Sequence, residues 1–233
     1  MSLRSLRLGF GLLMLAAVAT LTGCAAQIQK PIALDPQFWS EKEPTIGVAI
    51  TTLPASQLVL GGNQGLLALA INTGINSKLS AQVASWKLQD AATLPDEIVA
   101  KLQAKGYKAK KIDDVIDLAQ YKEAKFHEGF YARDLTPLQA KYGVDRLLLI
   151  SYTASGAYRT YYSVIPTSVP TPQVGGIGVM VDLRDNHLLW YKPFAVTQPA
   201  QGEWDQPNYA NLSNAYYQAV DSSRQMVITP FSK

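Results

Sequence analysis

The chain has 233 residues, of which 48% are hydrophobic and 17% charged, and its formal net charge is +3. That balance excludes the strongly basic stripe of a typical nucleic-acid-binding protein. Cys24 is the only cysteine, which excludes a disulfide framework or a thiolate metal site within one chain. The length permits one large or two small domains, and we expect one.

The first 23 residues have the pattern of a secretory signal peptide. Arg4 and Arg7 precede an uncharged apolar run over residues 8–21. A helix that spans a membrane needs about 20 apolar residues, and this run is shorter and is interrupted by Gly9 and Gly11. We therefore predict a leader over residues 1–23 that is removed, which leaves a nearly neutral mature chain.

The run ends at Leu21, Thr22, Gly23 and Cys24, which resemble the lipobox of bacterial lipoproteins. The resemblance implies cleavage before Cys24, diacylglycerol on its sulfur and a further fatty acid, such as palmitate, on the new amino terminus. Two or three acyl chains hold a protein firmly on a bilayer. The alternative interpretation of Cys24 is a buried free thiol.

The residue after the cysteine is Ala25. In enterobacterial lipoproteins an aspartate at this place signals retention in the inner membrane, so the resemblance favours a periplasm-facing protein of the outer membrane. Residues 24–43 are predicted to form a lipidated, flexible tether, because Pro31, Pro36 and the charged residues 41–43 discourage regular structure. Residues 44–233 then form the single domain.

Residues 45–53 are rich in β-branched side chains and predict a buried central strand. A turn is expected at residues 61–65, followed by a helix over residues 66–88. Its apolar side chains recur at helical spacing and predict a buried stripe, in which Gly74 either permits close packing or marks a break into two helices. The stripe consists of Leu67, Ile71, Ile75, Leu79, Val83 and Trp86.

Helix and strand alternate in the middle of the chain. Helices are predicted over residues 94–105 and 136–142, and each leads through a glycine into a strand, at residues 107–112 and 145–152, which is an α/β signature. Three further strands are predicted at residues 158–165, 173–183 and 187–196, the last two joined by a tight turn. A closing helix is expected over residues 209–226, with an inner side made of Leu212, Ala215, Tyr216, Ala219 and Val220.

The predicted fold class is therefore α/β with an α+β tendency. We expect a single mixed β-sheet of about five to six strands, flanked by helices, with a carboxy-terminal antiparallel hairpin and a closing helix. In chain order, residues 46–50, 94–113, 135–152 and 181–196 resemble envelope lipoprotein domains. These domains are similar to the amino-terminal domain of the Tol-Pal translocation protein, to curli-secretion-channel-like lipoproteins and to penicillin-binding-protein activator lipoproteins. The resemblance implies a periplasmic module that binds proteins or assembles, and it carries over no catalytic residue.

The sequence contains no residue pattern that is typical of a catalytic site, a phosphate-binding loop or a metal site. His127 and His187 belong to no metal-ligand pattern, and the glycine-rich residues 61–65 lack the lysine of a phosphate-binding loop. Ser151 and Ser155 have no base that the sequence identifies. We expect no enzyme activity, no cofactor and no metal site.

One segment has the composition of a binding surface. Tyrosine and arginine are enriched in binding hot spots, and the prolines at positions 166, 170 and 172 stiffen the same loop, so that less entropy is lost on docking. The alternative is an ordinary edge hairpin. The candidate partner-binding residues are Tyr158, Arg159, Tyr161, Tyr162 and Trp204.

The sequence thus favours a non-catalytic, lipid-anchored module of the bacterial cell envelope that docks a protein partner or associates with itself. Its partners would be the membrane, through the acyl chains on Cys24, and an envelope protein or a second copy, with no nucleic acid. An alternative is an oligomeric component of an export or secretion apparatus. A third hypothesis is a hydrolase that acts on cell-wall or glycan material.

Overall fold

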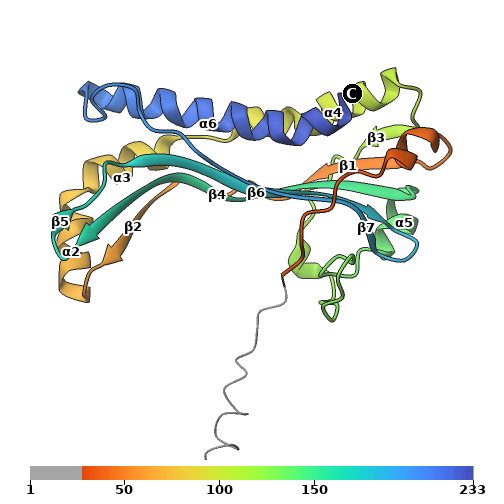
Figure 1. Ribbon diagram of the computed structural model, residues 1–233, viewed down its shortest axis with the longest axis horizontal. Coiled ribbons are helices and arrows are strands. Elements are labelled where there is room, and N and C mark those ends of the chain that lie inside the picture. The colour runs from red at the N-terminus through yellow and green to blue at the C-terminus, as the bar shows by residue number, and fades with distance from the viewer. Residues whose placement is uncertain (1–27, 233) are drawn as a thin grey trace, which may run out of the picture. The chain divides into compact units, whose positions relative to one another are not determined.

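The computed structural model describes residues 28–232, and the chain from Pro31 onward forms one compact unit (Figure 1). The signal peptide and the lipobox lie outside the described residues. The strands are β1 (Ile46–Ile50), β2 (Gln57–Asn63), β3 (Ala109–Lys111), β4 (Arg146–Tyr162), β5 (Ile165–Pro166), β6 (Thr171–Asp182) and β7 (His187–Thr197). The α-helices are α2 (Leu66–Ile75), α3 (Ser77–Ser85), α4 (Leu94–Ala104), α5 (Pro137–Tyr142) and α6 (Ala210–Ile228). Short 3-10 helices are η1 (Pro36–Ser40), η2 (Gln89–Thr93), η3 (Leu118–Gln120), η4 (Pro207–Tyr209) and η5 (Thr229–Phe231).

All seven strands belong to one mixed sheet with the order β3-β1-β4-β6-β7. β1 runs parallel to β3 and β4, whereas β4, β6 and β7 are antiparallel neighbours. Two strands lie off this path: β2 pairs parallel with the second half of β4, and the short β5 pairs antiparallel with its end. The predicted fold class is confirmed, and β2 and β5 account for the strands beyond the expected number.

β4 is one strand of 17 residues, where the sequence predicted two strands separated by a loop. It passes from β1 to β2 as its neighbour after an irregularity between Tyr152 and Ala154. Gly156, at φ 131°, allows the close approach of β2, since a Cβ there would lie 2.0 Å from the Gln57 carbonyl oxygen. The turn predicted at residues 61–65 was also wrong in its first half, because β2 continues to Asn63.

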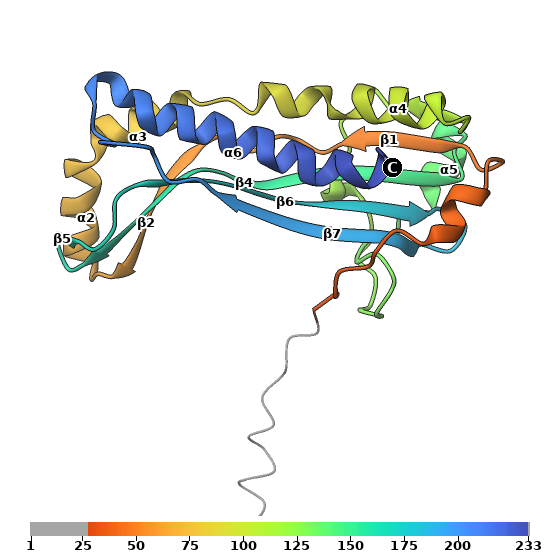
Figure 2. The same ribbon diagram turned by 45° about the horizontal axis from the view of Figure 1, so that its top comes forward.

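Two hydrophobic cores cover the two faces of the sheet, as the alternation of side chains along a strand requires. Leu148 and Ile150 point into the core beneath α3, α4 and α6, and Leu147 and Leu149 point into the opposite core with α5. Figures 1 and 2 show α3, α4 and α6 together on one side of the sheet. The closing helix is confirmed as α6, and its predicted inner residues are all buried, namely Leu212, Ala215, Tyr216, Ala219 and Val220.

The second half of the predicted tether packs against this unit. Ile32 forms an antiparallel bridge with Tyr191, and Phe38 is buried, with its ring stacked on Tyr107 at 5.2 Å between centroids. Arg146 and Glu41 form an ion pair in the same region. The prediction of a flexible tether was therefore wrong for residues 32–43, because one backbone bridge, the short helix η1 and one buried aromatic ring hold this segment against the domain.

Candidate functional site

The apolar stripe predicted on one long helix is divided between two environments. The helix breaks at Asn76, between α2 and α3, which confirms one of the two roles expected for Gly74. Leu79, Val83 and Trp86 are buried as predicted. The first half of the stripe was predicted wrongly, because Leu67 is 77% exposed and Ile75 is 69% exposed.

α2 turns its polar side toward the sheet instead. The amide of Asn72, fully buried, donates hydrogen bonds to the Gln64 side-chain oxygen (2.8 Å) and to the Ser163 carbonyl oxygen (2.9 Å). Asn76 is also buried, and its amide donates to the Asn72 carbonyl oxygen and to the Tyr161 hydroxyl, both at 2.7 Å. The buried amide N–H groups are tolerated because these bonds replace their hydration, whereas the Asn72 side-chain oxygen has no hydrogen-bond partner among the described residues. The apolar side chains of α2 consequently face outward.

We call this exposed surface the apolar end. Leu66, the first residue of α2, is 88% exposed. The turn between β4 and β5 lies against the end of β2, because the Ser163 N–H donates to the Asn63 carbonyl oxygen at 2.8 Å. Exposed apolar side chains that gather at one end of a domain are typical of a site that contacts a protein or a membrane. The apolar end consists of the exposed side chains of Leu66, Leu67, Ile71, Ile75, Tyr162 and Ile165.

The predicted partner-binding residues do not form one exposed surface. The Arg159 guanidinium lies 4.9 Å from the Trp204 ring centroid and 5.4 Å from that of Tyr161, and it donates to the Asn76 side-chain oxygen at 2.9 Å. Tyr161 is buried. Tyr158 and Tyr162 alternate with them on β4 and are exposed. The prediction was wrong for Arg159 and Tyr161, which hold Trp204 and α2 in place within the domain.

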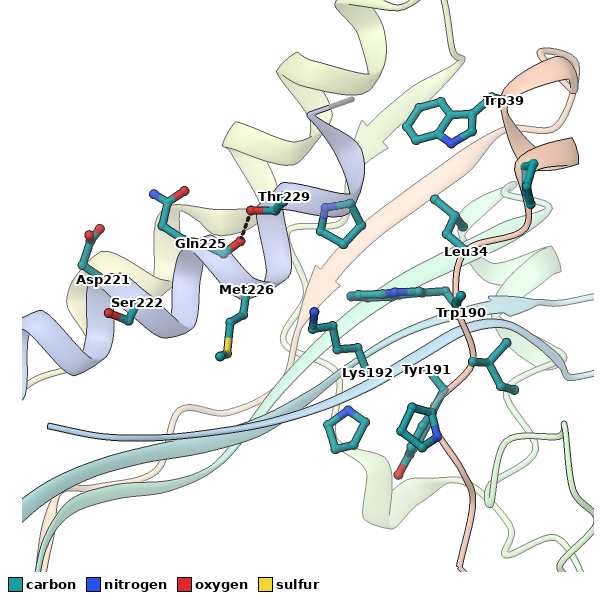
Figure 3. A pocket seen from close by; sticks show the side chains of 16 residues that line it. Leu34, Trp39, Trp190, Tyr191, Lys192, Asp221, Ser222, Gln225, Met226 and Thr229 are labelled. Carbon is teal, nitrogen blue, oxygen red and sulfur yellow. Dashed lines mark hydrogen bonds between the residues drawn. The ribbon is translucent and has the colours of Figure 1, made fainter.

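An apolar groove lies between the edge strand β7, the end of α6 and the segment that precedes β1 (Figure 3). Its volume is about 1160 Å³. Sequence analysis missed it, because it joins three segments that are far apart in the chain. Its apolar walls include Leu34, Trp39, Trp190, Pro193, Met226 and Pro230.

Trp190 forms the floor of this groove. Its indole packs over Gly178 of the neighbouring strand, where a Cβ would lie 2.5 Å from the ring. The ring of Phe231 meets it edge-on, with centroids 5.4 Å apart. Because Trp190 is held on two sides, the groove has a fixed aromatic base. Met226 points from α6 toward β7 above it (Figure 3).

The backbone of β7 accepts an extended segment at the rim of the groove. The Ile32 N–H donates to the Tyr191 carbonyl oxygen (2.9 Å), and the Tyr191 N–H donates back to Ile32 (3.0 Å). The next residue whose backbone faces the same edge is Pro193, which has no N–H to offer. Backbone pairing toward Pro193 therefore stops at the Ile32 bridge, and contacts in that direction must come from side chains. At the other end of the same edge, the Leu188 N–H donates to the Gly129 carbonyl oxygen at 2.7 Å.

Hydroxyl groups and histidines that could take part in catalysis or metal binding meet outside the groove, where their contacts stabilise the fold. The Ser155 hydroxyl contacts the Tyr216 hydroxyl (2.8 Å) and that of Ser56 (2.7 Å), all buried. Burial raises the pKa of Tyr216, so the tyrosine is a poor partner for activating a serine. His127 and His187 lie on two sides of the Phe130 ring. Within residues 28–232, the acids and histidines form no group that could hold a metal ion.

No protein-family model matches the sequence, and no curated protein matches it. Among solved structures, the chain is similar to lipoprotein GNA1162 from Neisseria meningitidis, with 13% identity, 77% of this chain and 97% of that chain covered, and a TM-score of 0.30. It is also similar to PelC of the dodecamer from Paraburkholderia phytofirmans (10% identity, 88% and 94% covered, TM-score 0.33). A third similar structure is protein XCC0632 from Xanthomonas campestris (11% identity, 79% and 94% covered, TM-score 0.34). At these TM-scores the similarities carry no conclusion about function, and the resemblance to the Tol-Pal, curli and penicillin-binding-protein activator lipoproteins stays a prediction.

Proposed function

We propose that this chain is a lipid-anchored, periplasm-facing and non-catalytic docking module of the bacterial outer membrane. The lipobox pattern that ends at Cys24 supports the anchor. The groove between β7, α6 and residues 31–39 is the observation that carries the docking role. Its occupant is an extended apolar segment of an envelope protein.

The shape of the groove favours an extended segment over a compact small molecule. It is open along the edge of the sheet, and the segment around Ile32 already lies there in an extended conformation with a backbone bridge to β7. Extended peptides that dock at sheet edges place alternate side chains in pockets, and at this groove those side chains would make the contacts, because Pro193 offers no N–H for backbone pairing. Trp39, which is partly exposed, supplies a rigid aromatic surface of the kind that dominates binding energy at protein interfaces, and the buried Trp190 supports the floor beneath it.

The charged side chains at the groove favour a peptide that carries polar groups beside its apolar anchors. Lys192 comes from β7 and Asp221 from α6, and both line the groove. The Asp221 carboxylate also lies 3.8 Å from the Arg224 guanidinium. A polar rim around an apolar centre is typical of protein interfaces.

Site-specific photo-crosslinking tests this proposal. A photoreactive amino acid replaces Met226, which lines the groove, or Tyr217, which lies on the same helix outside the groove. Both side chains are exposed to a similar degree. In intact cells, we expect a discrete adduct at position 226 only, which mass spectrometry identifies.

The identified protein is then purified and its binding measured. A dissociation constant about tenfold weaker for Met226→Arg than for Tyr217→Arg, equal to about 1.4 kcal/mol, would support the groove as the site. An adduct of two copies of this chain would instead favour the oligomeric alternative. Equal adducts at positions 226 and 217, or none at 226, would contradict the proposal.

A further inference from the structure

We infer that the apolar end is a lipid-contacting surface, which enters the interface of the membrane that also receives the acyl anchor. The inference goes beyond protein docking at the groove and uses different residues. Only its choice of membrane rests on the proposed anchor. The contact with lipid itself follows from α2, the β4–β5 turn and the charges around them.

The first step concerns the orientation of α2, which buries its polar side and exposes its apolar side. A surface helix of a water-soluble domain buries its apolar side and exposes its polar side. In α2 the amide of Asn72 is fully buried and hydrogen-bonded, whereas Leu66, Leu67 and Ile75 are largely exposed. The outward side chains are aliphatic and offer no hydrogen bonds, which suits hydrocarbon better than the polar rim of a protein interface.

The second step is the distribution of charge. No aspartate or glutamate occurs between Glu43 and Asp90, and none occurs between Asp145 and Asp182. These two stretches include α2, α3, β2 and the β4–β5 turn, which build this part of the domain. These elements carry no carboxylate of their own, and the nearest acids along the chain that packs on them are Glu203 and Asp205, which flank Trp204 beside Arg159. The ammonium group of Lys78, near the start of α3, would be attracted to anionic lipid headgroups.

Two tyrosines are exposed near the end of β4, on the face of the sheet opposite to Arg159 and Tyr161. Tyr158 and Tyr162 are both exposed on β4, and tyrosine is enriched where a membrane protein passes through the headgroup layer. Within residues 28–232, no helix combines the length and apolarity needed to cross a bilayer. α2 would therefore lie in the interface, as amphipathic anchors do.

α2 lies at one end of the sheet, beside β2 and β5 and next to α3 (Figures 1 and 2). Its exposed side chains are therefore at an end of the domain and are not covered by α4 or α6. An acyl anchor on the same chain would raise the local concentration of α2 at a membrane surface.

The test uses the chain from Ala25 onward, which carries no acyl group. The compact unit begins at Pro31 and contains both hydrophobic cores, and circular dichroism checks its folding. Flotation with vesicles of phosphatidylethanolamine and phosphatidylglycerol measures binding. We expect binding by the unchanged chain and a loss of about tenfold for the double variant Leu66→Gln, Leu67→Gln, which removes two exposed leucines from lipid contact.

Met226→Gln is the matched control, because it makes the same kind of change on α6, at the groove beside β7 and away from the apolar end. It should float like the unchanged chain. Hydrogen exchange should slow over residues 66–75 in the presence of vesicles. Equal flotation of all three proteins, or flotation of none, would overturn the inference.

Self-association would also overturn it. If the unchanged chain does not float with vesicles but forms oligomers, and the double variant does not form them, the apolar end is an interface between copies of this chain. Because no acyl chain is present, this experiment is independent of the anchor. We expect two results together: the chain from Ala25 onward binds vesicles, and a full chain with Cys24→Ser fails to localise to the membrane in cells. This pair of results would support the inference.

Discussion

The buried amide of Asn72 donates a hydrogen bond to the carbonyl oxygen of Ser163, 91 positions later in the chain, at 2.9 Å. This bond joins α2 to the turn between β4 and β5. It explains why a helix with an outward apolar side stays on the domain, since the helix is held by its polar groups. Two surfaces of different character result: an aliphatic end beside α2 and an aromatic groove beside β7.

Asn72→Ala should loosen α2. The change removes donors to Ser163 and Gln64 and leaves the Ser163 carbonyl oxygen without this partner, which costs about 1–3 kcal/mol for a buried group. Denaturant unfolding measures the loss, and hydrogen exchange should accelerate over residues 66–75. Thr73→Ala is the control, because the Thr73 hydroxyl bonds only within its own helix, to Leu69. Equal effects of the two changes would contradict this role of Asn72.

Gly178→Ala should disturb the floor of the groove. The added methyl group would lie 2.5 Å from the Trp190 ring, and overpacking of this kind costs about 1–3 kcal/mol. Gly74→Ala is the comparison, because a Cβ there meets nothing within 4 Å. Within α2 it should stabilise the chain by up to about 1 kcal/mol. Thermal unfolding measures both, and a neutral Gly178→Ala would show that Trp190 is not fixed.

Arg159 and Trp204 should be energetically coupled. The guanidinium lies over the indole at 4.9 Å from the ring centroid, and such contacts contribute about 0.5–1 kcal/mol at partly exposed sites. A double-mutant cycle with Arg159→Lys and Trp204→Leu measures the coupling from free energies of unfolding. Lysine keeps the charge but cannot stack as a planar group. If the changes in the free energy of unfolding were strictly additive, the contact between Arg159 and Trp204 would not hold the loop around Trp204 in place.

Tyr131 should make the domain sensitive to alkaline pH. Burial, together with the neighbouring Tyr191, raises the pKa of Tyr131 to about 12. Because the folded state then favours the neutral phenol, its contribution to stability is complete below the ordinary pKa of 10.0 and is lost as the pH rises toward about 12. The free energy of unfolding should therefore fall over this range, and less steeply in Tyr131→Phe. Tyr162→Phe, on the exposed turn, should follow the unchanged chain.

Much of the fold could be predicted from periodicity and turn residues. The β-branched and apolar strand segments and the glycines after α4 and α5 indicated the mixed sheet, and the inner side of α6 was correct residue by residue. The apolar repeat in residues 66–88 showed which side chains share one side of a helix. It could not show that a sheet would cover Val83 while leaving Leu67 in solvent.

The candidate sites were less accessible to prediction. Tyrosine and arginine composition pointed to residues 158–162, but alternation along β4 buries Tyr161 and turns Arg159 toward Trp204. The groove depends on contacts between residues 31–39, β7 and α6. Tertiary packing alone brings those segments together, and the prolines near residue 36 had indicated a tether.

Acylation of Cys24 is tested most directly by intact mass spectrometry of the chain purified in detergent from bacterial membranes. We predict a mature species that begins at Cys24 and carries a diacylglycerol group and one further acyl chain. An unmodified chain of full length, or one cleaved at a different residue, would contradict a lipid-anchored module.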